Sequence, residues 1–413
     1  MKRVVVLGNS LAGGKALADI RAAQPEAECL LVSLDGNLPY DPSRLAEYLA
    51  KDISQDDIMY QSPKYYAENN IQIILDKKIE KVNFKKNQLA TDQKEIIGYD
   101  ILIIAETPDH KFPDIKGTNK NSVFNLNKLA DVNQLSKDLI FINSVVIQSD
   151  AWAGVQQAYA LRKRGKEVLL IVSAKSVVAQ LAEEGVKLIT ENLEAQGIRI
   201  LFDSAIAEIL GDGDVKAVRL KSGKVLAADA VLFDEVLPNL RIFQDSPLQT
   251  EQRIKVNSFL RTNIENVYAV DAVAELASAS TQDLLEQGRV VAAVLQGQDV
   301  AFVPSLAWQG FSAPDLSVQW IGQTAVSAET QRHSRCHLAS KIYKEIFVSE
   351  NQISGAVLIN AGQLQEPIRR AIQEKTDARS GLDNILNSDA VQTQSSLAGE
   401  AAAANPSLSD QGS

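Results

Sequence analysis

The chain opens with Met1-Lys-Arg-Val-Val-Val-Leu-Gly-Asn-Ser-Leu-Ala-Gly-Gly-Lys-Ala16, and this stretch decides the fold. The apolar run from Val4 to Leu7 is too short for a helix, a turn follows at Gly8, and apolar residues then recur at helical spacing over 11–23. A second apolar strand ends at Val32, and Asp35 stands about twenty residues beyond the turn, where an acidic side chain can bond a ribose hydroxyl. The pattern predicts a βαβ unit of the kind that binds dinucleotides.

The glycine fingerprint of this unit is incomplete. In G-x-G-x-x-G the first glycine makes the turn, the second lets the backbone approach a pyrophosphate, and the third lets the helix pack on the strand. The three positions here read Gly8, Ser10 and Gly13. The glycines for the turn and for packing are therefore present, whereas the one for phosphate approach is replaced.

Length and composition limit the class of protein. A chain of 413 residues has room for two or three domains, and its net charge of −10 argues against a nucleic acid or an anionic membrane as partner. It has no apolar run of membrane-spanning length and no signal-peptide core, so we expect a cytoplasmic protein. The two cysteines, Cys29 and Cys336, lie outside any C-x-x-C motif, and Cys29 falls in an apolar strand, which favours a buried core thiol over a redox thiol.

The opening pattern returns in the middle of the chain. An apolar strand over 145–148, a turn over 149–154, a helix over 155–164 and a second strand over 167–172 repeat the first βαβ unit. Later segments predict a buried strand over 266–270, a helix over 284–295, and a smaller unit over 302–375 that contains a hairpin over 341–359. From residue 376 the apolar content is low, so we expect a disordered tail over 376–413, in which 382–386 is a candidate partner peptide.

The two βαβ units, together with three local motifs, resemble the two-dinucleotide flavoprotein family. The motifs are Leu38-Pro-Tyr-Asp41, Gly165-Lys-Glu-Val168 and Asn263-Ile-Glu-Asn-Val-Tyr-Ala269, and the similarity covers residues 1–375. This family includes NADH-dependent rubredoxin and ferredoxin reductases, the flavin domain of assimilatory nitrite reductase, and the pyridine nucleotide–disulfide oxidoreductases. Its members bind FAD in the first unit and NAD(P)H in the second, and pass electrons to a partner.

The resemblance implies an α/β fold with two Rossmann-like three-layer domains and a small C-terminal α+β domain. The FAD-type domain is expected over 1–113 and 241–301, the NAD(P)-type domain over 114–240, and the C-terminal interface domain over 302–375. We expect a protein partner, with the C-terminal domain as the contact in a homodimer or a larger complex.

In the FAD-type half, the family pattern maps onto Gly8, Ser10, Gly13, Asp35 and Asp271. Where the family has Ala-Thr-Gly, this chain has Ala-Glu-Thr over 105–107. Where the family has Gly-Asp, with the aspartate bonding the flavin's sugar-phosphate chain, this chain has Asp-Ala over 271–272. A slip of one residue would let Asp271 serve, although the sequence on both sides aligns without one.

The NAD-type half departs further from the family. Its three glycine positions read Ser149, Ala151 and Gly154, no acid ends the second strand, and Glu235 stands where a glycine is expected. Trp152 lies in the turn, either as a surface aromatic or as a plug in the space of the nicotinamide nucleotide. We therefore expect both nucleotide sites to be degenerate, with the NAD(P) site non-functional and FAD remaining only as a candidate cofactor.

Two functions remain open at this point. A carboxylate about 5 Å from a phosphate repels it by about 3 kcal/mol at an effective dielectric near 20. The acids at ligand positions therefore favour a non-catalytic structural or docking subunit, with an electron-transfer assembly as the candidate setting. The alternative is a working FAD-dependent NAD(P)H oxidoreductase that passes electrons to a small iron–sulfur or other protein.

No catalytic residue and no metal site is assigned. Ser43 lies in the region where single-cysteine family members carry the redox thiol, which removes disulfide chemistry. His333, Cys336 and His337 are close in sequence, but strand alternation would split them between two faces of a sheet.

Overall fold

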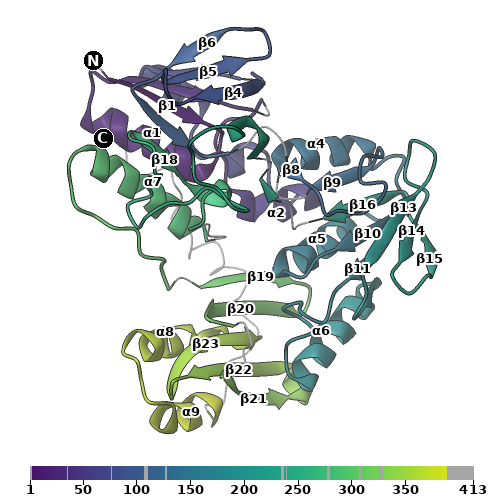
Figure 1. The fold of residues 1–413 in the computed structure, drawn as a ribbon. Coiled ribbons are helices and arrows are strands. Elements are labelled where there is room, and N and C mark those ends of the chain that lie inside the picture. Colours follow the sequence, from purple (N-terminus) through teal and green to yellow (C-terminus); the bar gives the residue numbers. More distant parts are fainter. Residues whose placement is uncertain are drawn as a thin grey trace. The chain divides into compact units, whose positions relative to one another are not determined.

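The computed structural model describes residues 2–34, 36–75, 77–106, 110–125, 128–233, 237–238, 240–276, 280–306, 308–324 and 329–387. The chain forms two compact units (Figure 1). Unit 1 comprises Met1–Gln180 and Ile189–Ser305, and unit 2 comprises Leu181–Leu188 and Leu306–Ser413. Both βαβ units lie in unit 1.

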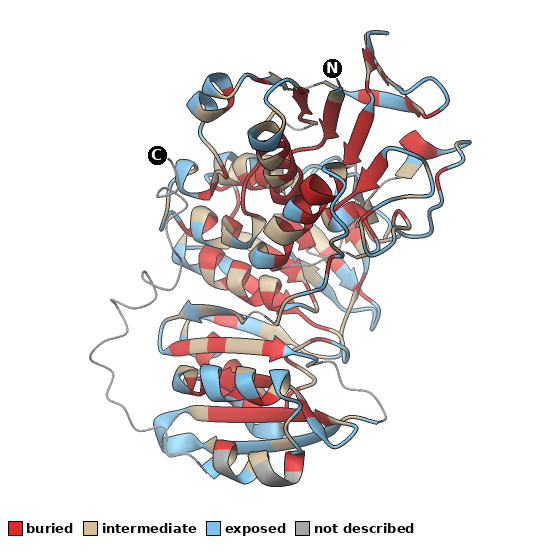
Figure 2. Ribbon diagram, turned by 90° about the vertical axis from the view of Figure 1, so that its left-hand side faces the viewer, coloured by how far each residue is buried: buried red, intermediate tan, exposed pale blue. Residues whose placement is uncertain are grey.

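The first sheet of unit 1 has five parallel strands around the opening strand β1. Their order is β18-β7-β1-β2-β3, with the bounds β1 Arg3–Leu7, β2 Glu28–Val32, β3 Ile71–Ile74, β7 Ile101–Ile104 and β18 Val267–Ala269. Their near-continuous apolar runs fit a parallel sheet that is covered on both faces, and the red colour of these strands in Figure 2 marks them as buried. The predicted α/β class is confirmed.

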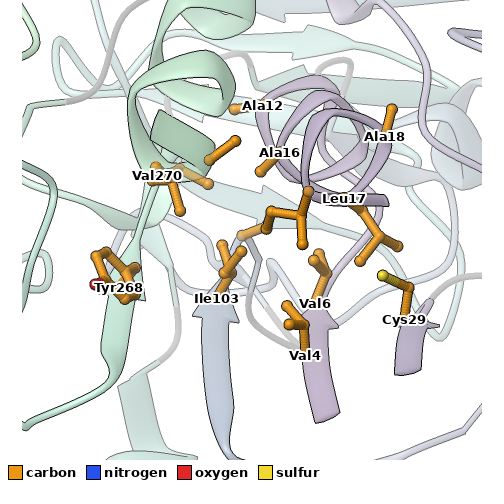
Figure 3. Packing of buried hydrophobic residues seen from close by; sticks show 14 of the residues in the cluster. Val4, Val6, Ala12, Ala16, Leu17, Ala18, Cys29, Ile103, Tyr268 and Val270 are labelled. Atoms are coloured by element: carbon orange, nitrogen blue, oxygen red, sulfur yellow. The ribbon is translucent and has the colours of Figure 1, made fainter. Parts of the chain in front are cut away.

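Two helices cover one face of this sheet, α1 (Leu11–Ala23) and α7 (Thr281–Leu295). They cross closely at Gly288, because a Cβ there would lie 2.5 Å from the carbonyl oxygen of Ala12. Figure 3 shows the resulting core, in which Leu17 of α1 packs on Val6 of β1. Cys29 is buried in the same cluster, and burial raises the pKa of its thiol, so the predicted core role of Cys29 is confirmed.

The other face of this sheet is covered by a small antiparallel sheet. Its strands are β4 Ile79–Asn83, β5 Gln88–Thr91 and β6 Ile96–Gly98, in the order β4-β5-β6. Two short helices, α2 (Leu45–Ala50) and α3 (Pro63–Glu68), lie in the connection between β2 and β3. The parallel sheet that contains β1 is therefore the middle one of three layers, between the helices α1 and α7 and the antiparallel sheet.

The second βαβ unit forms another five-stranded parallel sheet in the order β12-β11-β10-β16-β9. The strands are β9 Val123–Asn125, β10 Ser144–Gln148, β11 Glu167–Ile171, β12 Ile198–Leu201 and β16 Ala230–Phe233. Its helices are α4 Leu129–Asp138, α5 Trp152–Lys163 and α6 Glu183–Ala195; its antiparallel strands are β13 Ile206–Leu210, β14 Ala217–Leu220 and β15 Val225–Ala227. A two-stranded ribbon of β8 (His110–Lys111) and β17 (Leu237–Pro238) carries the two crossings between the halves. The internal repeat predicted from sequence is confirmed.

The two parallel sheets of unit 1 are tied together through α2 and α5. Lys163 forms an ion pair with Asp52, and Arg164 donates from Nη1 to the carbonyl of Leu49 at 2.9 Å. The basic end of α5 thus has partners on α2 and the residues just after it, and the two halves belong to one compact unit.

Unit 2 contains an antiparallel five-stranded sheet in the order β19-β20-β23-β22-β21. Its strands are β19 Gln309–Ala313, β20 Leu316–Gly322, β21 Gln331–His337, β22 Ile342–Ser349 and β23 Gln352–Ile359, and its helices are α8 Gln365–Gln373 and α9 Ala378–Asn387. This agrees with the small C-terminal α+β unit and with the hairpin expected over 341–359.

Helix α9 corrects one expectation. The tail was expected to be disordered from 376, yet 378–387 is helical and Ile385 is buried in the core of unit 2. Lys344 of β22 donates to the carbonyls of Ile385 and Leu386 at 3.3 and 3.1 Å. The average composition of the tail is polar, but residues 378–387 form a short amphipathic helix. The rest of the tail, 388–413, lies outside the described residues.

Candidate functional site

The start of α1 lies at the carboxyl end of the first parallel sheet, where dinucleotide-binding folds hold their pyrophosphate. Gly8 has φ +109°, and a Cβ at this position would lie 2.4 Å from Cβ of Glu106. A Cβ at Gly13 would lie 2.8 Å from Cβ of Ala105. Both glycines are needed for the close approach of α1 to β7 and the residues after it.

Ser10 caps α1. Its Oγ accepts a hydrogen bond from the backbone nitrogen of Gly13 at 3.1 Å, and its hydroxyl also bonds the carboxylate of Asp271. A capping serine satisfies one of the free N–H groups at the helix start. The side chain that replaces the second fingerprint glycine thus serves the helix itself and links it to Asp271.

A second carboxylate lies at the same helix start. Oε2 of Glu106 is 3.5 Å from the backbone nitrogen of Asn9, and Oε1 is 3.6 Å from Nζ of Lys128. The side chains of Glu106 and Lys128 are only 17% and 13% exposed. The N-terminus of a helix favours an anion, and here the chain supplies one from its own sequence.

Asp271 occupies a left-handed backbone position, with φ +61°, which a glycine adopts without strain. Its backbone nitrogen donates to Oε1 of the buried Gln287 at 2.7 Å, and its Oδ1 accepts from the nitrogen of Ala272 at 2.6 Å. Asp271, which aligns with the glycine of the family's Gly-Asp pair, thus has a left-handed backbone and contacts Ser10.

The environment of Asp271 disfavours its charged form. Burial raises the pKa of Asp271 to about 6, and the neighbouring Asp41 adds to the rise. The hydrogen bonds from Ala272 and Ser10 and the charge of Arg253 lower the pKa in part. Asp41 is held by Ser43 and Thr281, whose hydroxyls donate to its carboxylate at 2.7 and 3.0 Å.

Four of the five predicted FAD-type residues are thus close together: Gly8, Ser10, Gly13 and Asp271. The fifth, Asp35, lies outside the described residues, as do Thr107 and Glu235. The sequence analysis missed Lys128. A lysine just before a helix gives no local sign that it will pair with Glu106, which follows a different strand.

The residues fit a dinucleotide pyrophosphate at the backbone and oppose it at two side chains. The tight turn at Gly8 and the N–H groups of α1 form the cradle that such a ligand requires. The carboxylates of Glu106 and Asp271 lie at the same place, and each would repel a phosphate when charged. A ligand of this kind therefore needs Glu106 to turn toward Lys128 and Asp271 to take up a proton.

The polar groups at the turn of the second βαβ unit also form hydrogen bonds with other groups of this chain. Oγ of the buried Ser149 accepts from the nitrogen of Ala151 at 3.2 Å, and a Cβ at Gly154 would lie 2.2 Å from Cβ of Ser149. The carboxylate of Asp150 accepts from the nitrogen and the hydroxyl of Ser173 at 2.8 and 2.6 Å. Asp150 thus brings a carboxylate to the end of β11, where the sequence itself has none.

Trp152 is 5% exposed at the start of α5, so its interpretation as a surface aromatic is wrong. In the register of β21 with β22, His333 and His337 share one face and Cys336 lies on the other. Among the described residues, no three His, Cys, Asp or Glu side chains are grouped as metal ligands would be. No helix in these ranges is long and apolar enough to cross a bilayer.

Comparison with known proteins agrees with this architecture. The family model described as "Pyridine nucleotide-disulphide oxidoreductase" matches residues 2–297. The chain is 27% identical to the nitrite reductase [NAD(P)H] of Bacillus subtilis over 383 residues, which is 91% of this chain and 48% of that protein. It thus spans about half the length of the first curated relatives that it matches.

Other relatives match along nearly their whole length. The chain is 24% identical to the NADH-rubredoxin oxidoreductase of Clostridium acetobutylicum, over 94% of this chain and 98% of that protein. The fold also matches the reductase in the crystal structure of the covalent putidaredoxin reductase–putidaredoxin complex, with a TM-score of 0.78, 21% identity, and coverage of 93% and 98%. The resemblance drawn from the sequence motifs is confirmed.

Proposed function

Because the chain belongs to the pyridine nucleotide-disulphide oxidoreductase family, we propose that it is an electron-transfer oxidoreductase that uses FAD and NAD(P)H to reduce a small acceptor protein. The observation that carries this proposal is the extent of the match to NADH-rubredoxin oxidoreductase, which includes unit 2 as well as both parallel sheets. A reductase of this kind needs all three parts, and all three are present.

The residues that would hold FAD are those at the start of α1. Gly8 and Gly13 allow the close approach, the N–H groups of the first turn would meet the phosphates, and protonated Asp271 would donate a hydrogen bond to them instead of repelling them. Bound flavin would supply the transfer of a hydride from nicotinamide and of single electrons to an acceptor. The names of the relatives favour NAD(P)H as the reductant. The opposite expectation, that Ser149 and Ala151 make the NAD(P) site non-functional, stays a prediction.

A second candidate function rests on a different observation. At both βαβ turns, side chains of the chain itself already satisfy the groups that a ligand's phosphates would meet: Ser10 and Glu106 in the first, Ser149 and Asp150 in the second. This self-bonding favours a non-catalytic docking subunit that keeps the fold of the reductases.

One spectrum separates the two candidates. The purified chain is measured from about 300 to 550 nm, before and after incubation with FAD and removal of the excess, and NADH is then added without oxygen. Flavin bands that NADH bleaches would support the oxidoreductase, because a flavin in contact with nicotinamide accepts its hydride. A colourless protein in both samples would exclude it in favour of the docking subunit.

A further inference from the structure

Strand β21 is the outer edge of the sheet in unit 2. It pairs with β22 along seven residues, from Gln331 opposite Val348 to His337 opposite Ile342, and no described strand pairs with its other side. Alternate residues of an edge strand direct their N–H and C=O groups away from the sheet, and these groups can pair with another chain. The helices α8 and α9 belong to the apolar core of this unit.

The charge of this edge is opposite to that of the whole chain. Over residues 331–341 the chain has no Asp or Glu, and the basic or titratable side chains are Arg332, His333, Arg335, His337 and Lys341. All of them except the half-buried His333 are exposed. A chain with a net charge of −10 thus presents a positive strand.

Neighbouring acids neutralise only part of this charge. Arg332 lies 3.6 Å from the carboxylate of the buried Glu345 on β22, and Glu184 and Lys187 of α6 lie near Cys336. Arg335 stands opposite Lys344, whose Nζ donates hydrogen bonds to two backbone carbonyls of α9. Among the described side chains, no carboxylate forms an ion pair with Arg335.

From this geometry we infer that β21 is a docking edge for an extended acidic segment of a partner protein, which adds to the sheet as a sixth strand. Main-chain pairing supplies affinity in such an addition, and alternate side chains supply specificity. The charge on β21 selects the occupant, because opposite charges in cross-strand pairs attract and like charges repel. A second copy of β21 would bring one positively charged strand against another, so it is the less favourable occupant.

The inference does not depend on a bound cofactor and holds for either function proposed above. It goes beyond them by naming the surface and the chemistry of the partner. Charged edges also protect sheets from pairing with one another, and the experiment must separate that role from docking.

The test uses the full chain and three labelled decapeptides in fluorescence anisotropy. One alternates Glu with Val, one alternates Lys with Val, and one alternates Glu with Pro, which keeps the negative charge but removes strand pairing. We expect saturable binding of the Glu-Val peptide only, at least about tenfold tighter than the other two, and weakened several-fold when salt rises from about 50 to 300 mM.

The variant R335E/K341E reverses one charge on β21 and one just after it. The variant K81E/K85E makes the same charge change on and just after β4 in unit 1, where both lysines are exposed. We expect R335E/K341E to lose at least about tenfold in affinity and K81E/K85E less than about twofold, with melting temperatures near that of the parent. Equal binding by R335E/K341E, or equal binding of the Glu-Pro peptide, would overturn the inference. A dimer of the parent chain that R335E/K341E dissociates would instead identify a second copy as the occupant and also overturn it.

Discussion

The carboxylate of Glu106 lies 3.5 Å from the backbone nitrogen of Asn9, at the first turn of α1. This is where the family's fold receives a pyrophosphate, and the side chain reaches it from the residues just after β7. The contact is long and weak as a hydrogen bond, and the nearby Lys128 offers the carboxylate a second place. We therefore expect Glu106 to compete with any anion that binds at this turn.

Removing this charge should improve the binding of dinucleotides. We expect Glu106→Gln to raise the affinity for FAD about tenfold or more, because one carboxylate near a phosphate costs about 3 kcal/mol at most and screening reduces that figure. Titration followed by quenching of flavin fluorescence measures it. Glu80→Gln, at an exposed position on β4, is the matched control and should leave the affinity unchanged. No gain in Glu106→Gln would mean that the ligand does not use the start of α1.

Asp271 should make stability depend on pH. Its pKa is raised from 3.8 to about 6 on folding, so between these values the folded chain binds a proton that the unfolded chain does not. Ionised Asp271 therefore lowers the free energy of unfolding by its full amount above about pH 6, and this penalty is relieved gradually as the pH falls from about 6 to 3.8. We expect Asp271→Asn, which tolerates the same left-handed backbone, to raise the melting temperature most near pH 8, by about half as much near pH 5, and hardly at all once the pH is below about 3.8.

The control for this comparison is Asp299→Asn, at an exposed position after α7. It should shift the melting temperature equally little at each of these pH values. The same proton has a consequence for ligands, since a phosphate beside Asp271 favours the protonated form. Affinity for FAD or ADP should rise as pH falls from about 8 to 5.5, and a flat profile would contradict the contact with Asp271.

Gly288 should be intolerant of a side chain. A methyl group there would lie 2.5 Å from the carbonyl of Ala12 and 2.8 Å from the nitrogen of Ala16, so α1 and α7 would have to separate. We expect Gly288→Ala to lower the free energy of unfolding by about 1–3 kcal/mol, as overpacked cores do. Chemical denaturation measures the change. Gly98→Ala, where the nearest atom would be 4.0 Å away, should cost much less.

Tyr343 should matter for unit 2 through its hydroxyl. The hydroxyl donates to Oε2 of the fully buried Glu345 at 2.6 Å and accepts from the nitrogen of Ala182 at 3.1 Å. Burial raises the pKa of Glu345, and the bond from Tyr343 is one of the groups that offset this. We expect Tyr343→Phe to cost about 1–3 kcal/mol, since it leaves a buried acid with one donor fewer.

A comparable substitution in unit 1 provides the control. The hydroxyl of the buried Tyr66 has no hydrogen-bond partner among the described residues. Tyr66→Phe should therefore leave the free energy of unfolding unchanged or raise it slightly. A loss as large as that of Tyr343→Phe would mean that removing a buried hydroxyl costs stability whether or not it is hydrogen-bonded, and would contradict the role given to the bonds of Tyr343.

The sequence predicted the frame of this molecule better than its site. Apolar runs such as Val4–Leu7 and Val145–Ile147 specify buried parallel strands because few other structures accept them, and the helical spacing after each turn specifies α1 and α5. The fingerprint glycines also predicted the turn at Gly8, where φ is +109°, and the close packing at Gly13, because a side chain fits neither position.

The site depends on contacts that no local pattern encodes. Glu106 reaches Asn9 and Lys128 across the fold, and Asp150 reaches Ser173 at the end of another strand. Side-chain direction and pairs distant in sequence decide both contacts. Helix α9 was missed for a different reason, because its few apolar residues, such as Ile385, are hidden within a polar average and become informative only at helical spacing.

Helix α6 begins in unit 2 and ends in unit 1, because residues 181–188 group with the C-terminal part of the chain. Unit 2 is therefore discontinuous, and a protein fragment that starts at Leu306 would lack Ala182, the donor to Tyr343. During synthesis this segment leaves the ribosome long before β22 exists, so unit 2 completes its fold only after its C-terminal strands are made. Premature termination should thus yield a first unit with an unpartnered helix start, which quality-control proteases can recognise.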